Sequence, residues 1–202
     1  MIRPAREADN AQIAAIWNLE AIGTAATTDT EPRSADAQRG WLAVHTDDYP
    51  ALVAAVDDDV VAFGGLAPYR AKPSYARTVE DSVYVKGGWR GKGLGGLILD
   101  ALLAHAQRRG HRSMIARVTA ENEASLRLHE HHGFVRVGHE REAAFKLGLP
   151  VPHPAPFVGK LMTIAERARR ARRTQRETGR AMRPVSGTTT ATHVSLAAAA
   201  SS

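Results

Sequence analysis

The chain has 202 residues, which is long enough for one well-buried domain and an appended segment. It contains no cysteine, so its residues form no disulfide, no thiol nucleophile and no thiolate metal site. Its formal net charge of +6 is concentrated near the C-terminus, where eight arginines and two glutamates lie within residues 166–183. No apolar run is long enough to span a membrane and no signal peptide precedes the first charged residues, so we expect a cytoplasmic location.

The first part of the chain predicts a short strand followed by two helices. Residues 2–5 are expected to form the strand, and Asp9 is a candidate cap for a helix that runs to Trp17. Ser34 is a candidate cap for a second helix that runs to Val44. The threonine-rich stretch between these helices is interpreted as a loop.

A β-hairpin and a central strand are predicted next. Residues 51–56 and 60–66 are apolar runs joined by three aspartates, a pattern typical of a hairpin with a solvated turn. Residues 83–85 are β-branched or aromatic and indicate the end of a buried strand. A helix with apolar residues at helical spacing follows from Leu94 and is expected to end before Gly110.

The remaining elements are three strands and a short helix. Strands are predicted at residues 113–118, 134–138 and 157–164. The helix is expected between Asn122, a cap residue, and Gly133, a residue suited to the helix end. Together the elements indicate an α/β fold.

The segment between the central strand and its helix has the composition of a phosphate-binding turn. Glycines allow backbone N–H groups to approach an anion closely, and a helix N-terminus favours negative charge. Two cations, Arg90 and Lys92, add to this field. The predicted phosphate cradle consists of Arg90, Gly91, Lys92, Gly93, Leu94, Gly95 and Gly96.

Three interpretations of this turn are open on its residues alone. Gly91, Gly93 and Gly96 match the G-x-G-x-x-G pattern of NAD(P)-binding oxidoreductases, but no acidic residue ends the following strand as that fingerprint requires. The pattern R-x-x-G-x-G from Arg90 to Gly95 instead resembles the pyrophosphate loop of acyl-CoA-dependent N-acyltransferases. A glycine-rich turn without a ligand is the third interpretation.

The order of the motifs resembles the GNAT superfamily of N-acetyltransferases, over about residues 1–145. R-x-x-G-x-G lies between a strand and a helix, and N-x-x-A-S followed by G-F comes after the next strand. Within the superfamily the chain is most similar to the phosphinothricin/methionine sulfoximine N-acetyltransferase group, through I-R-P-A, T-E-P, E-x-S-V-Y-V and S-L-R-L-H-E. The resemblance implies a central mixed, mostly antiparallel sheet with helices on both faces, and acetyl-CoA as co-substrate without a metal ion.

The chemistry of amine acetylation needs a proton acceptor, because an amine attacks a thioester only as the free base. Glu80, on the central strand just before the cradle, is our candidate, and the resemblance implies the same role. Asp81 is expected on the opposite face of the strand and is the weaker candidate. The resemblance also implies that His129 protonates the leaving thiolate, in the place where most of the superfamily has a tyrosine.

The resemblance further implies the contacts of the pantetheine arm. These are the strand backbone at Val83, Tyr84 and Val85, and the side chain of Asn122. Transfer is expected to be direct, in a ternary complex, because no cysteine is present to carry the acyl group.

Two segments depart from the group's pattern near the expected acceptor site. Residues 145–160 lack the tryptophan and aspartate of G-x-W-x-D, and residues 23–28 are small and polar where the group tends to have an aromatic residue. We therefore predict a small amine, an amino acid or an amino-acid analogue as acceptor, and phosphinothricin itself is disfavoured.

We predict a domain boundary between residues 1–164 and an Arg-rich, then low-complexity tail over residues 165–202. Outside residues 166–183 the chain has nineteen basic and nineteen acidic residues, so the first domain is neutral. The tail is interpreted as a partly helical, otherwise disordered extension without a function of its own. The alternative hypothesis is that it binds nucleic acid or another polyanion weakly. A homodimer is a further hypothesis.

Overall fold

The computed structural model describes residues 1–24, 26–138, 145–146, 149–150 and 157–159. The chain divides into two units, residues 1–168 and 169–202, and all described residues belong to the first. In chain order its elements are β1 (Ile2–Pro4), η1 (Glu7–Asp9), α1 (Asn10–Trp17), η2 (Asn18–Ile22), α2 (Ala35–Ala43), β2 (Ala51–Val56), β3 (Asp59–Pro68), η3 (Pro73–Tyr75), β4 (Thr78–Val85), α3 (Leu94–Arg108), β5 (Ser113–Val118), α4 (Glu123–His131), β6 (Phe145–Lys146), β7 (Leu149–Pro150) and β8 (Phe157–Gly159).

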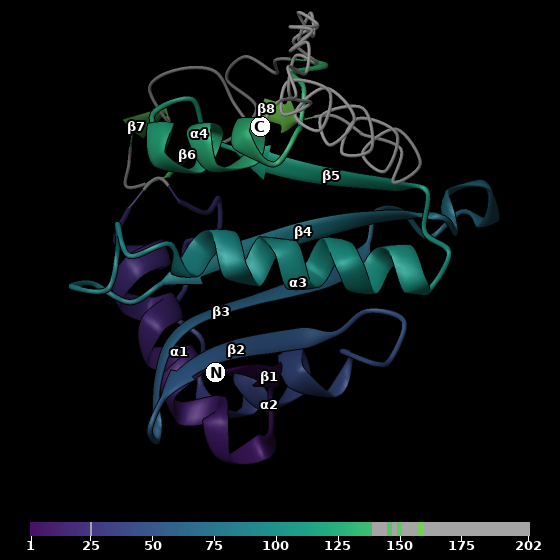
Figure 1. Ribbon diagram of the computed structural model, residues 1–202. Helices are drawn as coiled ribbons and strands as arrows, with labels where there is room; N and C mark the ends of the chain where they lie inside the picture. Colours follow the sequence, from purple (N-terminus) through teal and green to yellow (C-terminus); the bar gives the residue numbers. More distant parts are fainter. Residues whose placement is uncertain (25, 139–144, 147–148, 151–156, 160–202) are drawn as a thin grey trace, which may run out of the picture. The chain divides into compact units, whose positions relative to one another are not determined.

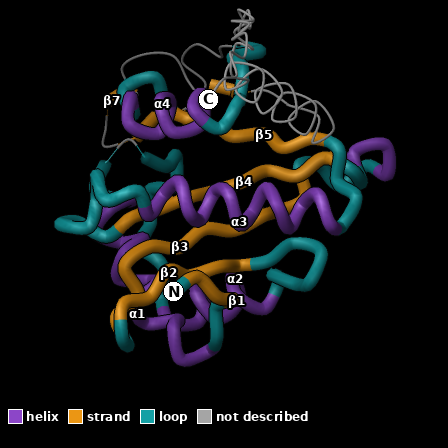
Figure 2. The backbone as a smooth tube through the Cα atoms, in the orientation of Figure 1, coloured by secondary structure: helices purple, strands orange, loops and turns teal. Residues whose placement is uncertain are grey.

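The central feature is a six-stranded sheet in the order β1-β2-β3-β4-β5-β8. Figure 2 labels the strands from β1 to β5, and Figure 1 also labels β8. All neighbouring strands are antiparallel except β4 and β5, which are parallel because α3 connects them as a crossover. The predicted mixed, mostly antiparallel sheet is therefore confirmed. β6 and β7 form a separate two-stranded pairing.

Helices cover both faces of this sheet, as predicted, and α3 lies along one face in Figure 1. Successive residues of β2 point to opposite faces: Leu52 joins the core beneath α3, whereas Val53 joins the core beneath α1. On α3 the buried stripe includes Ile98 and Leu102, each worth roughly 1.5–3 kcal/mol of burial. Gly64 on β3 allows α3 to pack closely against the sheet, because a Cβ at this position would lie only 2.6 Å from a methyl carbon of Ile98.

The caps of the helices agree with the sequence at two of three sites. Ser34 Oγ accepts a hydrogen bond from the Ala37 N–H at 3.1 Å, and Asn122 Oδ1 accepts one from the Ser125 N–H at 3.1 Å. The prediction for Asp9 is wrong, since it makes no side-chain bond to the start of α1.

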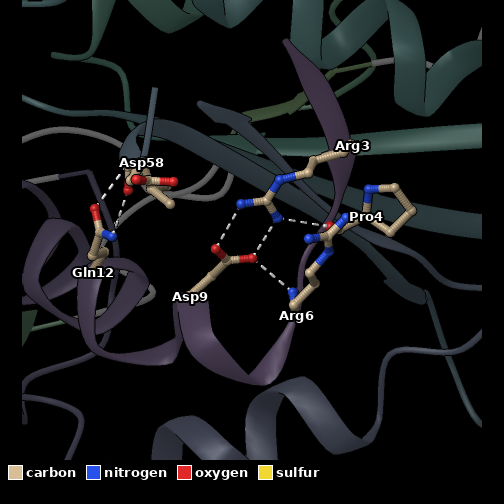
Figure 3. A network of polar contacts seen from close by, with 7 residues as sticks. Arg3, Pro4, Arg6, Asp9, Gln12 and Asp58 are labelled. Carbon is tan, nitrogen blue, oxygen red and sulfur yellow. Dashed lines mark hydrogen bonds and ion pairs between the residues drawn. The ribbon is translucent and has the colours of Figure 1, made fainter. Parts of the chain in front are cut away.

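Figure 3 shows where the Asp9 carboxylate is used instead. It accepts two hydrogen bonds from the Arg3 guanidinium, at 2.6 and 2.8 Å, and one from the Arg6 N–H at 2.7 Å. These bonds lower the pKa of the Asp9 carboxyl, with the Arg3 bond as the main cause. Asp9 therefore ties the turn before α1 to strand β1.

Two of the predicted strands differ from the structure. Residues 134–138 contain only a single bridge residue, Arg136, and the side chains of Val135 and Val137 are exposed, so the expected strand is absent. The last strand is present at Phe157–Gly159, while residues 160–164 lie outside the described residues. No helix in the described ranges has both the length and the apolar character needed to cross a membrane.

Candidate active site

Two adjoining pockets lie where β4 and β5 separate. The large pocket, about 1050 Å³, is lined by β4, by the turn after it, by the first turns of α3 and by α4 along its length. The small pocket, about 190 Å³, is lined by residues 26–28, by β4 and by β5. Five residues line both pockets, so the two spaces are neighbours: Ala26, Val83, Tyr84, Asn122 and Ser125.

The separation of β4 from β5 follows from their register. The parallel pairing runs from Thr78 opposite Ser113 to Asp81 opposite Ala116 and goes no further. Residues 83–85 pair with β3 on one side, and on the other side they line the large pocket. Their backbone therefore offers a free strand edge among the described elements, which is where an extended ligand can form ladder-like hydrogen bonds.

The turn before α3 has the backbone that an anion cradle requires. Gly91 and Gly93 have φ of +76° and +80°, a region that disfavours side chains, and a Cβ at either residue would meet no atom within 4 Å beyond its chain neighbours. Gly93 caps α3. The first N–H groups of this helix have no partner within it, and they lie at the end of α3 that lines the large pocket. This open, glycine-lined helix start therefore has room for an anion next to unpaired backbone N–H groups.

Gly95 and Gly96 have a second role in the packing of the two helices. A Cβ at Gly95 would lie 3.3 Å from Leu128 on α4, and one at Gly96 would lie 3.4 Å from His132. The absence of side chains at these positions therefore brings α4 close to the start of α3.

Ten of the eleven predicted cofactor-binding residues line the large pocket. They are Val83, Tyr84, Val85, Arg90, Gly91, Gly93, Leu94, Gly95, Gly96 and Asn122. The eleventh, Lys92, lines neither pocket. Its ammonium lies 4.4 Å from the centre of the Trp89 ring, a cation–π contact that directs the charge toward the indole.

Arg90 has a carboxylate partner that the sequence did not reveal. Glu20 on η2 binds the Arg90 guanidinium, and its other oxygen accepts the Gly87 N–H at 2.7 Å. Glu20 also lines the large pocket. This carboxylate links η2 to the cradle and holds Arg90 at the pocket rim.

Glu80 lies in the small pocket and faces the side of the sheet that carries α1. Its carboxylate lies 3.6 Å from Arg117 Nη2 on β5, and its side chain is 27% exposed. Burial raises the pKa of Glu80 above its usual value; the positive Arg117 opposes this shift and the negative Asp81 adds to it. A partly buried carboxylate with a raised pKa is suited to accept a proton.

His129 lies on the opposite face of β4 and is paired with Asp81. Its Nδ1–H donates to the Ser125 carbonyl at 2.7 Å, and its Nε2 lies 3.0 Å from Asp81 Oδ2. Burial lowers the pKa of His129, but the hydrogen bond and charge of Asp81 outweigh this and raise it overall. Because both ring nitrogens face acceptors, the geometry favours an imidazolium bound to a carboxylate whose side chain is fully buried.

The histidines that follow His129 form no metal site within the described residues, where no group of three or more metal-ligating side chains occurs. His132 donates from Nδ1 to the Leu128 carbonyl at 2.7 Å, and its Nε2 lies 3.7 Å from Asp100.

A buried lysine holds the loop that forms one wall of the small pocket. Lys146 Nζ donates to the backbone carbonyls of Ala21, Thr24 and Thr27 at 3.2, 2.8 and 2.9 Å. An ammonium has three N–H donors, so these three carbonyls satisfy it fully. Burial lowers the pKa of Lys146, and the negative Asp29 opposes this shift.

Comparison with known proteins identifies the family. The model of the acetyltransferase (GNAT) family matches residues 13–134. The chain belongs to the GNAT acetyltransferase family. It is an acetyl-CoA-dependent N-acetyltransferase, and the predicted family, fold and co-substrate are confirmed.

Two curated relatives and one solved structure illustrate the similarity. A phosphinothricin N-acetyltransferase from Streptomyces coelicolor is 37% identical over 73% of this chain and 88% of its own. An L-methionine sulfoximine/L-methionine sulfone acetyltransferase from Salmonella typhimurium is 34% identical over 73% of this chain and 86% of its own. The crystal structure of a phosphinothricin acetyltransferase from Sinorhizobium meliloti with acetyl-CoA has a TM-score of 0.72, with 27% identity over 79% of this chain and 85% of its own. None of these supports the oxidoreductase alternative or the polyanion-binding alternative.

Proposed function

We propose that this N-acetyltransferase transfers the acetyl group of acetyl-CoA directly to the α-amine of an amino acid or an amino-acid analogue. The observation that carries the proposal is the pair of adjoining pockets. The large pocket contains the anion cradle and the free strand edge, while the small, polar pocket contains Glu80. The pairing of β4 with β5 ends at Asp81, and the two pockets share five lining residues, which supports transfer between a cofactor in the large pocket and an acceptor in the small one.

In the proposed reaction Glu80 receives a proton from the acceptor's ammonium group, directly or through a water molecule. The neutral amine nitrogen then attacks the thioester carbonyl carbon, the carbon–sulfur bond breaks, and coenzyme A leaves as a thiolate. The raised pKa of Glu80 suits this transfer, because it makes the carboxylate a better proton acceptor.

His129 is the proposed source of the proton or positive charge for the thiolate. Its imidazolium lines the small pocket, on the α4 side of β4 and beside Asn122 and Ser125, which line both pockets. Asp81 keeps the ring charged in a buried environment and is therefore proposed as a positioning residue for His129. The cradle, Arg90 and Asn122 are proposed to hold the pantetheine and pyrophosphate.

The acceptor class rests on the relatives' names and on the size of the small pocket. The relatives described above act on phosphinothricin, methionine sulfoximine or methionine sulfone, which are amino-acid analogues. A volume of about 190 Å³ suits an acceptor of this size. Much of residues 145–160, the segment that argues against phosphinothricin itself, lies outside the described residues.

The test is a panel of acceptors with acetyl-CoA, in which free thiol is quantified and the product is identified by mass spectrometry. The panel contains L-amino acids, L-methionine sulfone, phosphinothricin and polyamines. We expect release of thiol with at least one amino acid or analogue and formation of its N-acetyl derivative. Acetylation of polyamines alone would refute the proposed acceptor class.

The homodimer, the cytoplasmic location, the domain boundary after residue 164 and the binding of polyanions by the tail stay predictions. We propose a cytoplasmic location because the reaction consumes acetyl-CoA. Polyanion binding is supported by the eight arginines within residues 166–183.

A further inference from the structure

Arg117 is a cation that lines the small pocket together with Glu80, and its position bears on which substrate the pocket binds. Arg117 lies on β5 and faces the same side of the sheet as Glu80, because its neighbours Ala116 and Val118 point into the core beneath α3. Both Arg117 and Glu80 line the small pocket.

The ion pair between these two side chains is loose. The closest nitrogen–oxygen distance is 3.6 Å, and the Arg117 side chain is 45% exposed. An exposed pair at this separation contributes little to stability. The guanidinium therefore retains N–H donors that can bind a second anion in the pocket.

The other positive group that lines the small pocket lies on the opposite face of β4 and already has a partner. His129, the other cation among the described lining residues, forms a buried pair with Asp81. Among the described residues of the small pocket, Arg117 is thus the cation with free capacity for a ligand.

We propose that Arg117 binds the α-carboxylate of the acceptor while Glu80 binds its α-ammonium group. This inference rests on the proposed function and names the residue that selects the acceptor. In an α-amino acid the nitrogen and the nearest carboxylate oxygen are about 3 Å apart. The opposite charges of Glu80 and Arg117 have a comparable separation, so a zwitterion is complementary to the pair in both sign and spacing.

This arrangement also orients the nucleophile. Binding at two points places the amine on Glu80, whereas an amine without a carboxylate is held at one point only. Arg117 is therefore a specificity-determining residue that contacts the substrate.

The test compares Arg117→Met with the wild-type enzyme on two acceptors. One is L-methionine sulfone, and the other is 3-(methylsulfonyl)propan-1-amine, the same molecule without its carboxylate. Measurement at pH 8 limits the contribution that Arg117 makes through the pKa of Glu80. We expect kcat/KM for methionine sulfone to fall about tenfold, mainly through KM, since a charged hydrogen bond at a half-exposed site is lost. The value for the amine should stay within about twofold.

Two further variants complete the design. Arg117→Lys keeps the charge and should retain part of the preference for the carboxylate acceptor, because lysine binds as a point charge. Arg112→Met removes an exposed arginine just before β5 that lines neither pocket, and it should leave both acceptors unaffected.

The outcomes separate this inference from the proposed function. If the wild-type enzyme acetylates neither acceptor nor any other amino acid, the proposed function fails. If it acetylates methionine sulfone but Arg117→Met impairs both acceptors equally, or neither, the inference alone is overturned. Equal impairment together with weaker acetyl-CoA binding overturns it as well, because the role of Arg117 would then be structural.

Discussion

The pair formed by His129 and Asp81 predicts a pH-dependent loss of stability in the variant Asp81→Asn. In the wild-type protein the imidazolium is held 3.0 Å from a carboxylate whose side chain is fully buried. Breaking a buried pair costs about 3–5 kcal/mol, and we expect the lower end because His129 escapes the penalty by releasing its proton. A loss of about 3 kcal/mol lowers Tm by about 6–12 °C in a domain of this size.

The sign of the pH dependence follows from the raised pKa of His129. The pair stabilises the fold fully below the pKa of an unfolded histidine, about 6.5, and this contribution is lost as pH rises through the folded pKa. At high pH the neutral ring still donates Nδ1–H to Ser125, so an asparagine N–H at position 81 can donate to Nε2. The difference in Tm should therefore be large at pH 6 and small at pH 9.5.

The assay is thermal unfolding of both proteins without acetyl-CoA, at steps between pH 6 and pH 9.5. Asp100→Asn is the matched control, because this carboxylate lies 3.7 Å from His132 but is 56% exposed. We expect the control to change stability by no more than about 0.5 kcal/mol. A difference between Asp81→Asn and wild type that is independent of pH, or that grows toward alkaline pH, would refute the charged pair.

Three other predictions concern the cradle, the loop and the tail. Gly93→Val should abolish the thermal stabilisation by acetyl-CoA. Gly88→Val should keep it, because Gly88 has a similar φ of +75° but lines neither pocket. Equal effects of the two substitutions would mean that backbone strain is the cause. Lys146→Met should raise KM for L-methionine sulfone at least about fivefold with little change in acetyl-CoA affinity, because the carbonyls of Ala21, Thr24 and Thr27 lose their shared donor. An unchanged KM in a folded variant would contradict the role of Lys146 in holding this loop. A protein that ends at Ile164 should retain acetyl transfer and lose binding to heparin at low salt, and persistent binding would place the polyanion contact in the first domain.

Much of the fold was predictable because its signals are local. The hairpin of β2 and β3 was visible as two apolar runs around a turn, and Ser34 and Asn122 cap helices through bonds to residues three positions away. The strand predicted at residues 134–138 was wrong because that prediction used a local pattern alone, whereas a strand also needs a neighbouring strand to pair with. Val135 and Val137 alternate as in a strand, but no described neighbouring strand pairs with them beyond the bridge at Arg136.

The cradle residues were predictable for a chemical reason, since closely spaced glycines with two cations at a helix start are typical of an anion-binding turn. The partners of these residues were not. Glu20 reaches Arg90 across 70 residues of sequence, and Lys146 reaches the carbonyl of Ala21 across 125. Glu20 and Lys146 are ordinary charged residues in their local sequence, and only the folded chain shows what they bind.

For Asp81 the sequence predicted the position of the side chain but not its partner. Its placement on the face opposite Glu80 follows from the period of a strand, and the structure agrees. Its partnership with His129 does not follow, because it depends on how α4 packs beside β5. The sequence therefore placed the two adjacent carboxylates on opposite faces of β4, while the partners of both, Arg117 for Glu80 and His129 for Asp81, required the structure.

The proposed role of Glu80 as acceptor of the amine's proton is tested most directly by Glu80→Gln. The substitution keeps the shape of the side chain and removes its basicity, so we expect kcat for L-methionine sulfone at pH 7 to fall at least about a hundredfold, with acetyl-CoA affinity unchanged. The loss should shrink as pH rises, because more of the substrate is then a free amine. The measurement is the pH profile of kcat for both proteins between pH 6 and pH 10. An unchanged kcat at pH 7, or a loss of equal size at every pH, would contradict this role of Glu80.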